Sequence, residues 1–560
     1  MNLSITNKNK KNFALKKNSS IKEALKLISK NLERICFVVD NKNKLIGSIS
    51  DGDIRRALIK GCKINEKVTN VYNKDFIFLQ EGFSLNEAYK KFSGWAYVLP
   101  VVNKSGTFLG IIRKHDLVPF LDIRSKKVLV VGLGYVGLTL SLVLAEAGFQ
   151  VKGIDKSKKI VELINNKKAP FYEKGMQGYL GKYVNKNFKV AIKLSTADIY
   201  VITVGTPFDK KNNSPDLSNL KKSIEEISQI IKKEDLIILR STVPIGCTRK
   251  LVTSIIERKT KLRFGRDIFL AFCPERTIEG KAIEELKKLP QIIGSYCKKS
   301  SELAKRFFGE YNFTVVEVEN LESAEMCKLI DNSYRDTMFA YSNQLALLSE
   351  KLNLNLPEIL DKVNLGYARN KIPKPSPGVG GPCLTKDSYI LYDNFKEQKI
   401  NNPNIVLVSR KANESMINHI VERCCKKLRN INKKKNAKIF ITGFAFKGNP
   451  ETSDLRSSTT VSFLNLLKKK KFTNIWGHDF KIEKKEIEIL GVKNCRIEDG
   501  FRDADAIFVM NNHKKYEDLD LINLIKKTNK PCLFFDSWQI FNPNEIKGIL
   551  GITYASVGTN

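Results

Sequence analysis

Apolar positions between residues 126 and 155 predict a strand, a turn and a buried helix, followed by a second strand. The segment "VLVVGLGYVGLTLSLVLA", Val128 to Ala145, contains 18 residues without a charged side chain. A charge-free run of that length is close to what a membrane-spanning helix needs. Three glycines interrupt it at its middle, however, and nothing else in the chain supports a lone span. We therefore expect a folded α/β unit here and no membrane partner.

Further apolar runs continue this alternation and predict two parallel-sheet lobes. In the first lobe they are "ADIYVITVGTP", "DLIILRSTVP" and "IFLAFCPER". After the basic segment "NINKKKNAK" the pattern starts again with "KIFITGFAFKG", "NIWGHDF", "ADAIFVMNNH" and "CLFFDSWQIF". Strands that alternate with helical stretches are typical of parallel sheets covered by helices. The expected fold class is α/β, with two Rossmann-like domains joined by a long central helix and preceded by an α+β repeat pair.

The long helix is expected from about Leu321 to Leu352. Lys328, Asn332 and Arg335 fall at i, i+4 and i+7, so one face of this helix carries three polar groups. A solvated stripe would explain them, but the next turns, "MFAYSNQLALL", are apolar. We expect the polar face to meet a ligand or an interface.

The first 122 residues contain an internal repeat. The segment "VVDNKNKLIGSISDGDI" is echoed by "VVNKSGTFLGIIRKHDL", so that Gly47 matches Gly110 and Asp53 matches Asp116, an offset of 63 positions. Each repeat is expected to form an amphipathic helix, two short strands and the start of a further helix. The repeat resembles a pair of CBS modules, which often bind adenosine nucleotides between their halves.

The CBS resemblance implies a nucleotide site in the first module. Ser50 and Asp53 stand where such modules hold the ribose and phosphate, and Arg55 could meet a phosphate as a charge-assisted donor. The second module carries Arg113 in place of the hydroxyl residue, which puts a second nucleotide site in doubt. A pair that is purely structural or oligomerising, without a ligand, stays an equal alternative.

The length of the chain predicts its number of domains, and its charge bears on the kind of partner it binds. A chain of 560 residues predicts three or four domains. Its 96 lysines and arginines exceed its 59 acidic residues, for a net charge of +37, but the basic runs are mostly lysine and are spread along the sequence. Nucleic-acid binding would need that charge gathered on one face. We expect a solvated basic surface that suits a phosphorylated small substrate, and no nucleic-acid partner.

Cysteine usage predicts a reducing compartment and no metal site. The chain has 11 cysteines, no C-x-x-C spacing and only four histidines, none at ligand spacing. The odd count and the polar, basic start "MNLSITNKNKKN" indicate a cytoplasmic protein without a signal peptide.

The glycine motif of the first lobe predicts a dinucleotide site. Gly132, Gly134 and Gly137 form G-x-G-x-x-G between the strand and the helix, and Asp155 follows the next strand. The glycines allow a pyrophosphate to approach the helix N-terminus. Asp155 would accept hydrogen bonds from the ribose and repel a 2′-phosphate, which favours NAD over NADP.

A single cysteine follows the glycine-rich stretch "KPSPGVGGPCLTKD", Lys374 to Asp387. Glycines let the backbone turn tightly or approach another molecule. The thiol of Cys383 could be a nucleophile, or it could be a small buried hydrophobe, which is the commoner fate of a free cysteine. The loop alone leaves both interpretations open.

From Lys126 to Asn560 the chain resembles the UDP-glucose/GDP-mannose dehydrogenase family, four-electron oxidoreductases that act on nucleotide sugars. The motifs that carry the resemblance occur in the family's order: "GLGYVG", "STVPIG", "CPERTIEG", "SAEMCKLIDNSYRD", "PGVGGPCLTKD" and "GFAFKGNPETSDLRSS". The resemblance implies an NAD domain, a central helical domain that forms a homodimer or higher oligomer, and a UDP-sugar domain. The boundaries we expect are 1–122 for the CBS pair, 123–318, 319–430 and 431–560.

In this family the C6 alcohol of the sugar becomes a carboxylate in two hydride transfers, which consume two NAD⁺. The resemblance gives the thiol of Cys383 the role of adding to the intermediate aldehyde, so that the second transfer leaves a thioester. A positive surrounding would lower the pKa of this thiol.

The resemblance also implies roles for the neighbouring polar residues. Lys328 would stabilise the oxyanion with Asn332 as a hydrogen-bond donor. Asp387 would position a water or accept a proton, and Glu275 would activate water on the thioester. Thr242 would place its hydroxyl near that water and the nicotinamide.

Two further sets follow from the resemblance. The implied NAD-binding residues are Gly132, Gly134, Tyr135, Val136, Gly137, Asp155, Thr206 and Thr242. The implied substrate-binding residues are Arg276, Thr277, Lys328, Asn332, Arg335, Arg369, Ser376, Gly380, Lys447 and Arg456. Of these, Arg456 resembles the family arginine that reaches into the partner subunit's site.

The sequence "CPER" resembles the branch of the family that uses N-acetylated hexosamines. The substrates we expect are UDP-N-acetylmannosamine or UDP-N-acetylglucosamine, with UDP-glucose possible, in the synthesis of a surface polysaccharide. Two other functions stay open: a two-electron hydroxyacid-type dehydrogenase, which needs no thiol, and a catalytically silent nucleotide-sensing protein.

Overall fold

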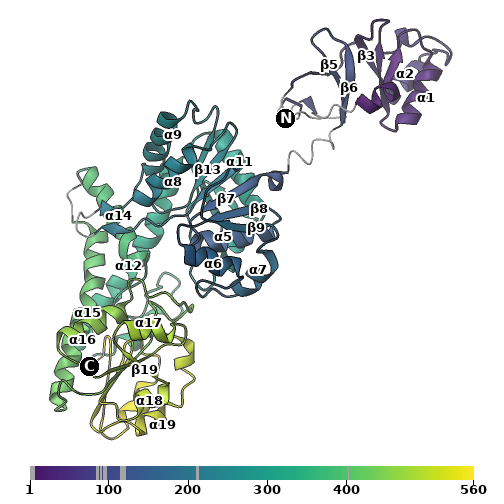
Figure 1. Cartoon of the computed structure of the whole chain (residues 1–560). Coiled ribbons are helices and arrows are strands. Elements are labelled where there is room, and N and C mark those ends of the chain that lie inside the picture. The colour runs from purple at the N-terminus through teal and green to yellow at the C-terminus, as the bar shows by residue number, and fades with distance from the viewer. Residues whose placement is uncertain are drawn as a thin grey trace. The chain divides into compact units, whose positions relative to one another are not determined.

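The computed structural model describes residues 7–83, 87–88, 91–92, 97–113, 122–209, 214–400 and 403–559. The chain divides into two compact units, Met1–Ser125 and Lys126–Asn560. Figure 1 colours the first unit purple to blue, and the second from blue through green to yellow. The finer boundaries expected at residues 318 and 430 are not tested by this division and stay predictions.

The first unit contains the repeat as two similar three-stranded sheets, which confirms the predicted internal repeat. Their strand orders are β1-β2-β3 and β4-β5-β6, and each combines one parallel and one antiparallel pair. The register shifts between Val38 and Val39 and, at the equivalent place, between Val101 and Val102. Asp116 lies outside the described residues. The elements are η1 (Asn7–Asn12), β1 (Ala14–Lys16), α1 (Ile21–Asn31), β2 (Ile35–Val39), β3 (Leu45–Ser50), α2 (Asp51–Ile59), η2 (Val68–Asn70), β4 (Leu79–Gln80), β5 (Val98–Val102) and β6 (Phe108–Arg113).

The second unit begins with an eight-stranded sheet in the order β16-β15-β14-β13-β10-β7-β8-β9. All neighbouring strands are parallel except β14 and β15. The uncharged segment forms β7, a loop and α5, as predicted, and nearly all of α5 is buried. The strands are β7 (Lys127–Val131), β8 (Gln150–Ile154), β9 (Phe188–Ala191), β10 (Ile199–Ile202), β13 (Leu236–Leu239), β14 (Phe269–Phe272), β15 (Gln291–Ser295) and β16 (Val315–Glu317).

Helices and a short hairpin connect these strands, and Figure 1 shows the helices packed around the sheet. The helices are α5 (Tyr135–Glu146), α6 (Lys158–Asn165), α7 (Met176–Tyr183), α8 (Ser218–Ser228), the π-helical η5 (Thr248–Val252), α9 (Thr253–Lys259), α10 (Ala282–Lys288) and α11 (Lys298–Gly309). The hairpin consists of β11 (Phe208–Asp209) and β12 (Ser214–Pro215).

A helical segment links the two sheets of the second unit. Its longest helix, α12 (Leu321–Lys351), starts at Asn320, whose side chain accepts a hydrogen bond from the Ser323 N–H. Helices α13 (Leu356–Asn364), α14 (Leu384–Glu397) and α15 (Ile405–Asn430) follow, and α14 and α15 both pack against α12. The expected long helix is therefore present, with the expected start.

The C-terminal sheet has six parallel strands in the order β19-β18-β17-β20-β21-β22. The basic segment after α15 leads into β17, as predicted. The elements are β17 (Ile439–Thr442), α16 (Thr459–Lys469), β18 (Ile475–His478), α17 (Lys484–Ile489), β19 (Lys493–Asn494), α18 (Ile497–Phe501), β20 (Ala506–Val509), η6 (Lys514–Tyr516), α19 (Leu521–Lys526), β21 (Cys532–Asp536), α20 (Pro543–Lys547) and β22 (Ile552–Ser556).

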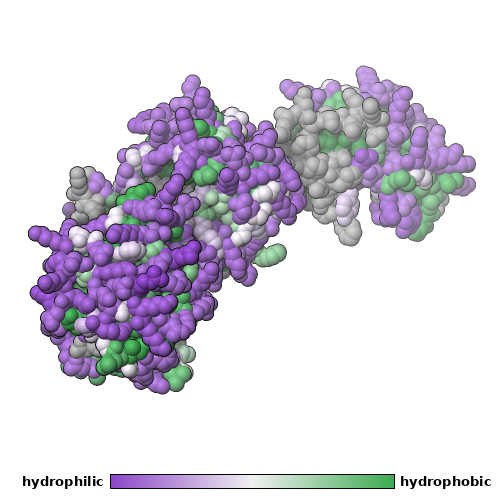
Figure 2. Space-filling view, turned by 60° about the horizontal axis from the view of Figure 1, so that its bottom comes forward, coloured by the Kyte–Doolittle hydropathy of each residue, from purple (hydrophilic) through white to green (hydrophobic). Residues whose placement is uncertain are grey.

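Two surface properties bear on function. Within the described ranges, no helix combines the length and the apolar character that crossing a membrane requires. Figure 2 shows hydrophilic residues over most of the visible face of the second unit, with scattered hydrophobic spots between them.

Candidate active site

The glycine-rich loop between β7 and α5 forms one wall of a cleft of about 710 Å³. Gly132 has a φ of +94°, and a Cβ on Gly137 would lie 1.8 Å from the Gly132 carbonyl oxygen, so both positions require glycine. Gly134 precedes α5, and no atom lies within 4 Å of where its Cβ would be. A pyrophosphate can therefore approach the first N–H groups of α5, beside Tyr135 and Val136.

Asp155 lines this cleft directly after β8. One carboxylate oxygen accepts the Leu133 N–H at 2.8 Å and the other accepts the Ser157 N–H at 2.8 Å. These bonds fix the carboxylate where a ribose would lie. Thr206 and Thr242 line the same cleft, and the Thr206 hydroxyl donates to the Thr242 carbonyl at 2.6 Å. The donor set and the open glycine loop fit a dinucleotide.

The same cleft contains Cys383, which precedes the first residue of α14. The glycines before it allow close packing on the C-terminal lobe: a Cβ on Gly381 would lie 2.7 Å from the Phe446 ring, and one on Gly380 would lie 2.7 Å from the Ser457 carbonyl oxygen. The loop thus reaches its position by lying directly on the C-terminal lobe.

The Cys383 residue is exposed to the cleft. The surrounding protein nevertheless raises the pKa of its thiol through burial, while Lys328 lowers this pKa and Asp387 raises it. Lys328 therefore acts in the expected direction, but burial outweighs it and the net shift is upward. The structure thus corrects the expectation of a lowered thiol pKa.

Lys328 and Asn332 lie one turn apart on α12 and are both buried. The Asn332 amide donates to Asp387 at 2.5 Å, and the Lys386 ammonium donates to the other Asp387 oxygen at 2.7 Å. Arg335 is exposed and donates to the Asn332 side-chain oxygen. The predicted polar face of α12 thus turns toward the loop that carries Cys383.

Glu275 lies in the wall of the cleft with both carboxylate oxygens engaged. One accepts the N–H groups of Arg276 and Thr277, each at 2.8 Å, and the other accepts a 2.5 Å hydrogen bond from Arg240. Burial alone would raise the pKa of Glu275, but Arg240 and the Thr277 N–H outweigh it and the pKa is lowered. Arg240 lines the cleft as well and was absent from the predicted residues.

A second carboxylate that the sequence analysis did not single out, Glu279, also faces this cleft. Burial raises the pKa of Glu279 to about 7, Asp454 adds to the rise, and Arg456 and Lys447 oppose it. It lies inside the quoted motif "CPERTIEG", four residues after Glu275. The only signal for Glu279 in the sequence was the glycine that follows it. In the structure this Gly280 has a φ of +91° and marks a turn.

Two predicted substrate residues from the C-terminal lobe reach the cleft region. The Lys447 ammonium donates to the Glu279 carbonyl at 2.6 Å, and burial lowers the pKa of Lys447 to about 8. Arg456 pairs with Asp454 at 2.6 Å, and its guanidinium lies 5.3 Å from the centre of the Tyr135 ring. Arg456 therefore lies in the cofactor cleft of its own chain, and its expected reach into a partner's site stays a prediction.

The other predicted substrate residues are more scattered. Arg276 forms an ion pair with Asp331 of α12 at 2.6 Å. Ser376 is fully buried and donates to the Gly378 carbonyl at 2.9 Å, which is a contact within the loop. Arg369 lies over the Tyr367 ring at 4.7 Å, outside the lining of the cleft.

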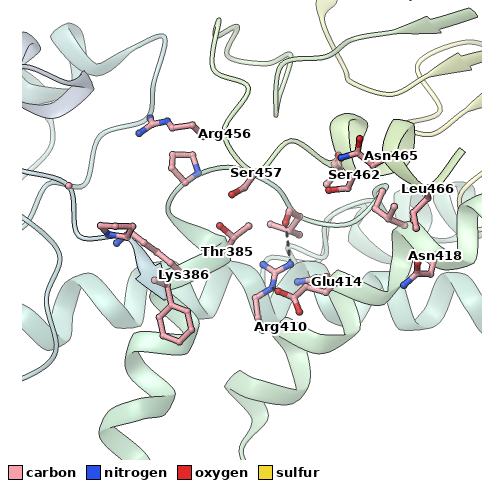
Figure 3. Close-up of a pocket in the computed structure, with 18 of the residues that line it drawn as sticks. Thr385, Lys386, Arg410, Glu414, Asn418, Arg456, Ser457, Ser462, Asn465 and Leu466 are labelled. Atoms are coloured by element: carbon pink, nitrogen blue, oxygen red, sulfur yellow. Dashed lines mark hydrogen bonds and ion pairs between the residues drawn. The ribbon is translucent and has the colours of Figure 1, made fainter. Parts of the chain in front are cut away.

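A second groove of about 770 Å³ opens beside the cleft and shares Thr206, Pro382, Lys386 and Arg456 with it. Figure 3 shows Arg410, Glu414 and Asn418 of α15 on one side of this groove, and Ser462 and Asn465 of α16 on the other. Arg410 is buried and donates to Asp336 at 2.8 Å and to the Val379 carbonyl at 3.1 Å. It thereby fixes the loop before Cys383 to α12.

The predicted nucleotide residues of the CBS pair form contacts of their own. Ser50 and Asp53 make a capping box at the start of α2, in which the Ser50 hydroxyl donates to Asp53 at 2.7 Å. Arg55 forms an ion pair with Asp51 at 3.1 Å. Arg113, at the second-repeat position that matches Ser50, forms an ion pair with Glu33 of the first repeat.

Comparisons with known proteins agree with this geometry. Residues 126–312, 322–415 and 440–543 match the NAD binding, central and UDP binding domains of the UDP-glucose/GDP-mannose dehydrogenase family. This chain belongs to that family. It is an NAD-dependent nucleotide-sugar dehydrogenase. Residues 8–60 and 68–122 match CBS domains.

Members of the family with known names cover most of the second unit. UDP-N-acetyl-D-mannosamine dehydrogenase of Campylobacter jejuni is 32% identical over 401 residues, which is 70% of this chain and 96% of that protein. NDP-N-acetyl-D-galactosaminuronic acid dehydrogenase of Ralstonia nicotianae is 28% identical over 71% of this chain and 94% of its own length. The solved UDP-D-ManNAc dehydrogenase of Pyrococcus horikoshii covers 77% of this chain and 99% of its own, with a TM-score of 0.70 and 28% identity.

Proposed function

We propose that this dehydrogenase oxidises the C6 hydroxyl of a UDP-N-acetylhexosamine to the carboxylate in a four-electron reaction. The observation that carries the proposal is the convergence of Cys383, Lys328 and Glu279 on the cofactor cleft, together with the buried Asn332–Asp387 pair, whose Asp387 N–H donates to the Cys383 carbonyl. The names of the relatives favour UDP-N-acetylmannosamine, followed by other N-acetylated hexosamines such as UDP-N-acetylglucosamine; UDP-glucose stays possible. The product would serve the synthesis of a surface polysaccharide.

The thiol makes the second oxidation feasible. When bound, NAD⁺ supplies the hydride acceptor, and two molecules are consumed for each sugar. The first oxidation leaves an aldehyde, which has to become tetrahedral before it can lose a second hydride. The deprotonated sulfur of Cys383 adds to the aldehyde carbon, and the second oxidation turns this thiohemiacetal into a thioester. Water then cleaves the carbon–sulfur bond and releases the acid and the thiol.

The polar residues of α12 and α14 support these steps. The ammonium of Lys328 stabilises the negative oxygen of the tetrahedral intermediates and favours the thiolate, because it lowers the thiol pKa. The Asn332 amide, held by Asp387, donates to the same oxygen through its remaining hydrogen. Thr242 lines the cleft where the reacting carbon and the water would meet.

The base that activates water is one of two glutamates. Glu275 is the base that the sequence predicts. Its ion pair with Arg240 and its two N–H contacts, however, occupy both of its carboxylate oxygens. Glu279 has a pKa of about 7, which suits a base that works near neutral pH. We therefore assign the proton transfer to Glu279 and a supporting role to Glu275.

Substrate and partners follow from the remaining contacts. The proposed contacts to the sugar and diphosphate are Arg276, Thr277, Arg335, Arg369, Ser376, Gly380 and Lys447, whereas Arg456 is assigned to the cofactor pyrophosphate because of its place beside Tyr135. The expected setting is the cytoplasm, which suits eleven cysteines that are all free. An adenine nucleotide at Ser50, Asp53 and Arg55 is a further expectation.

A second copy of the chain is the proposed partner. Met326, Ile330, Tyr334, Tyr341 and Leu348 are exposed and share one face of α12. Soluble monomers rarely expose so continuous an apolar stripe. A homodimer through this face would cover it, on the side of α12 roughly opposite the face that carries Lys328, Asn332 and Arg335.

Counting NADH per sugar tests the proposal. With UDP-N-acetylmannosamine, UDP-N-acetylglucosamine and UDP-glucose as a panel, we expect close to two NADH for each sugar consumed, and release of the uronate. One NADH would indicate the two-electron hydroxyacid-type reaction, and none with any sugar would indicate a silent nucleotide sensor. Cys383→Ser should stall after the alcohol step, whereas Cys297→Ser, a partly buried cysteine outside the cleft, should leave the count unchanged.

A further inference from the structure

The backbone of the loop that carries Glu279 into the cleft is held by hydrogen bonds to carboxylates. Four of its backbone N–H groups donate to glutamate side chains at 2.7 to 2.8 Å. The pairs are Arg276 and Thr277 to Glu275, Ile278 to Glu285, and Gly280 to Glu173. The position of Glu279 thus depends on these acceptors.

One of these acceptors is itself fixed by a buried cation. Arg240, at the end of β13, has a side chain that is 1% exposed and pairs with Glu275 at 2.5 Å. Its guanidinium also donates to Gln291 at 3.1 Å and lies 5.2 Å from the centre of the Phe308 ring. Contacts on three sides therefore hold Arg240 in one orientation.

We propose that Arg240 is a positioning residue for the oxidation: its ion pair with Glu275 fixes the 276–280 loop and so holds Glu279 in the cleft that contains Cys383. The inference rests on the proposed function for the role of Glu279. Arg240 acts through Glu275 and does not itself receive a proton.

The charge state of Glu275 explains why the loop needs an arginine. An ionised carboxylate is an acceptor at both oxygens, so one of them can take two N–H groups while the other takes the guanidinium. Without Arg240, burial would favour the protonated acid. A proton on the oxygen that Arg240 leaves would turn that oxygen into a donor, and the other, now part of a neutral carboxyl group, would hold the N–H groups of Arg276 and Thr277 more weakly.

The pKa values of Glu275 and Glu279 depend on the charged and titratable groups that face them. Glu275 faces Arg240 and Tyr311, and both of these face Cys273. Glu279 faces Asp454, Arg456 and Lys447 from the C-terminal lobe, and Tyr135 and Cys383 across the cleft. A shift of the loop changes the distances from Glu279 to Arg456 and Lys447, the two cations that hold its pKa down.

The test combines a measurement without substrate and one with it. Hydrogen exchange on the full-length protein reports the N–H groups of Arg276 and Thr277 directly. Single-turnover kinetics with UDP-N-acetylmannosamine separates the first NADH from thioester hydrolysis. The variants are Arg240→Met, Arg240→Lys and the double variant Arg240→Met/Glu275→Gln, which leaves no unpaired buried charge and should fold. Arg249→Met is the control, because it breaks a more exposed arginine–glutamate pair, with Glu322, away from the cleft.

In Arg240→Met we expect at least ten-fold faster exchange at both N–H groups and at least ten-fold slower hydrolysis. The first NADH should form within three-fold of the wild-type rate, and the pH midpoint of hydrolysis should move upward. Arg240→Lys should recover part of both effects, and Arg249→Met should show neither.

The double variant Arg240→Met/Glu275→Gln distinguishes two roles for Arg240: positioning the loop, or only neutralising the buried charge of Glu275. If it hydrolyses the thioester at the wild-type rate, or if the loop of Arg240→Met exchanges as slowly as wild type, the positioning role is overturned. If wild type itself forms no second NADH, the proposed function fails, and the exchange data alone then decide on Arg240.

Discussion

Asn332 of α12 donates a 2.5 Å hydrogen bond to Asp387 of α14, and both residues are completely buried. This bond joins the central helix to the helix that Cys383 precedes. Leaving either partner unsatisfied in such a place costs roughly 1–3 kcal/mol. The distance between the thiol and Lys328 is thereby set by a contact between two helices.

The first prediction concerns the titration of the Cys383 thiol. Asp387 raises the thiol pKa and Lys328 lowers it, so Asp387→Asn should lower this pKa and Lys328→Met should raise it. The rate of iodoacetamide alkylation at Cys383 against pH, followed by mass spectrometry, measures both shifts. Lys328→Met should also lower kcat by about 10²-fold or more, because a donor to the developing oxyanion is lost. Shifts in the same direction in the two variants would contradict the arrangement.

The second prediction concerns Glu279. Because its pKa is about 7, thioester hydrolysis should accelerate as the pH rises through 7. Glu279→Gln should be roughly 10²–10⁴-fold slower and should lose this pH dependence. Glu284→Gln, which alters an exposed glutamate of α10, serves as the control.

The same shift has a consequence for stability. A folded-state pKa above the unfolded value means that the folded protein binds the proton more tightly, so this group's contribution to stability declines as the pH rises from about 4.5 to 7. Glu279→Gln should therefore unfold at a higher temperature than wild type above pH 7. An unchanged melting profile between pH 5 and 8 would show that Glu279 does not titrate as described.

The third prediction concerns the exposed face of α12. Ile330→Asp places a charge in the centre of the apolar stripe and should convert the dimer to monomers in sedimentation velocity. Leu550→Asp, at a residue that is 93% exposed in the C-terminal lobe, should leave the dimer intact. A wild-type protein that sediments as a monomer would leave this face without its proposed partner.

The fourth prediction concerns the CBS pair. Calorimetric titration of the full-length protein with AMP or ATP should show one binding event, because Arg113 and its ion pair with Glu33 occupy the second position. Asp53→Ala should abolish this binding, whereas Asp75→Ala, in an exposed loop of the same unit, should not. Asp53→Ala also removes the carboxylate half of the capping box at α2, while the Ser50 oxygen still accepts the N–H of residue 53. Absence of binding to wild type would favour the purely structural alternative.

The features that sequence predicts well here are those that local chemistry dictates. The uncharged run resolves into β7, a loop and α5, because a strand ends where glycine takes a positive φ. The spacing of Lys328 and Asn332 places them on one face of α12, and the apolar turns around them indicate that this face is covered. The position of Cys383 after a glycine run identifies a close backbone approach, although not what it approaches.

The remaining features depend on how distant segments pack. Arg240 and Glu275 are 35 positions apart, and nothing in either strand pattern pairs them. Arg456 meets Glu279 across 177 positions, so its place in the cofactor cleft follows only from the contact between the two lobes. The pKa of Glu279 has the same origin, because its largest cause is burial. Periodicity reports which face of an element is covered, but not by which partner.

The segment after β22 has a consequence for the synthesis of the chain. Gly558 accepts the Ser349 hydroxyl at 3.1 Å and the Leu356 N–H at 3.0 Å, and its own N–H donates to Glu350 at 3.0 Å. Ser349 leaves the ribosome 209 residues ahead of Gly558. The end of α12 must therefore wait for the whole C-terminal lobe to be translated before these bonds can form. A tag fused close behind Gly558 would crowd this junction.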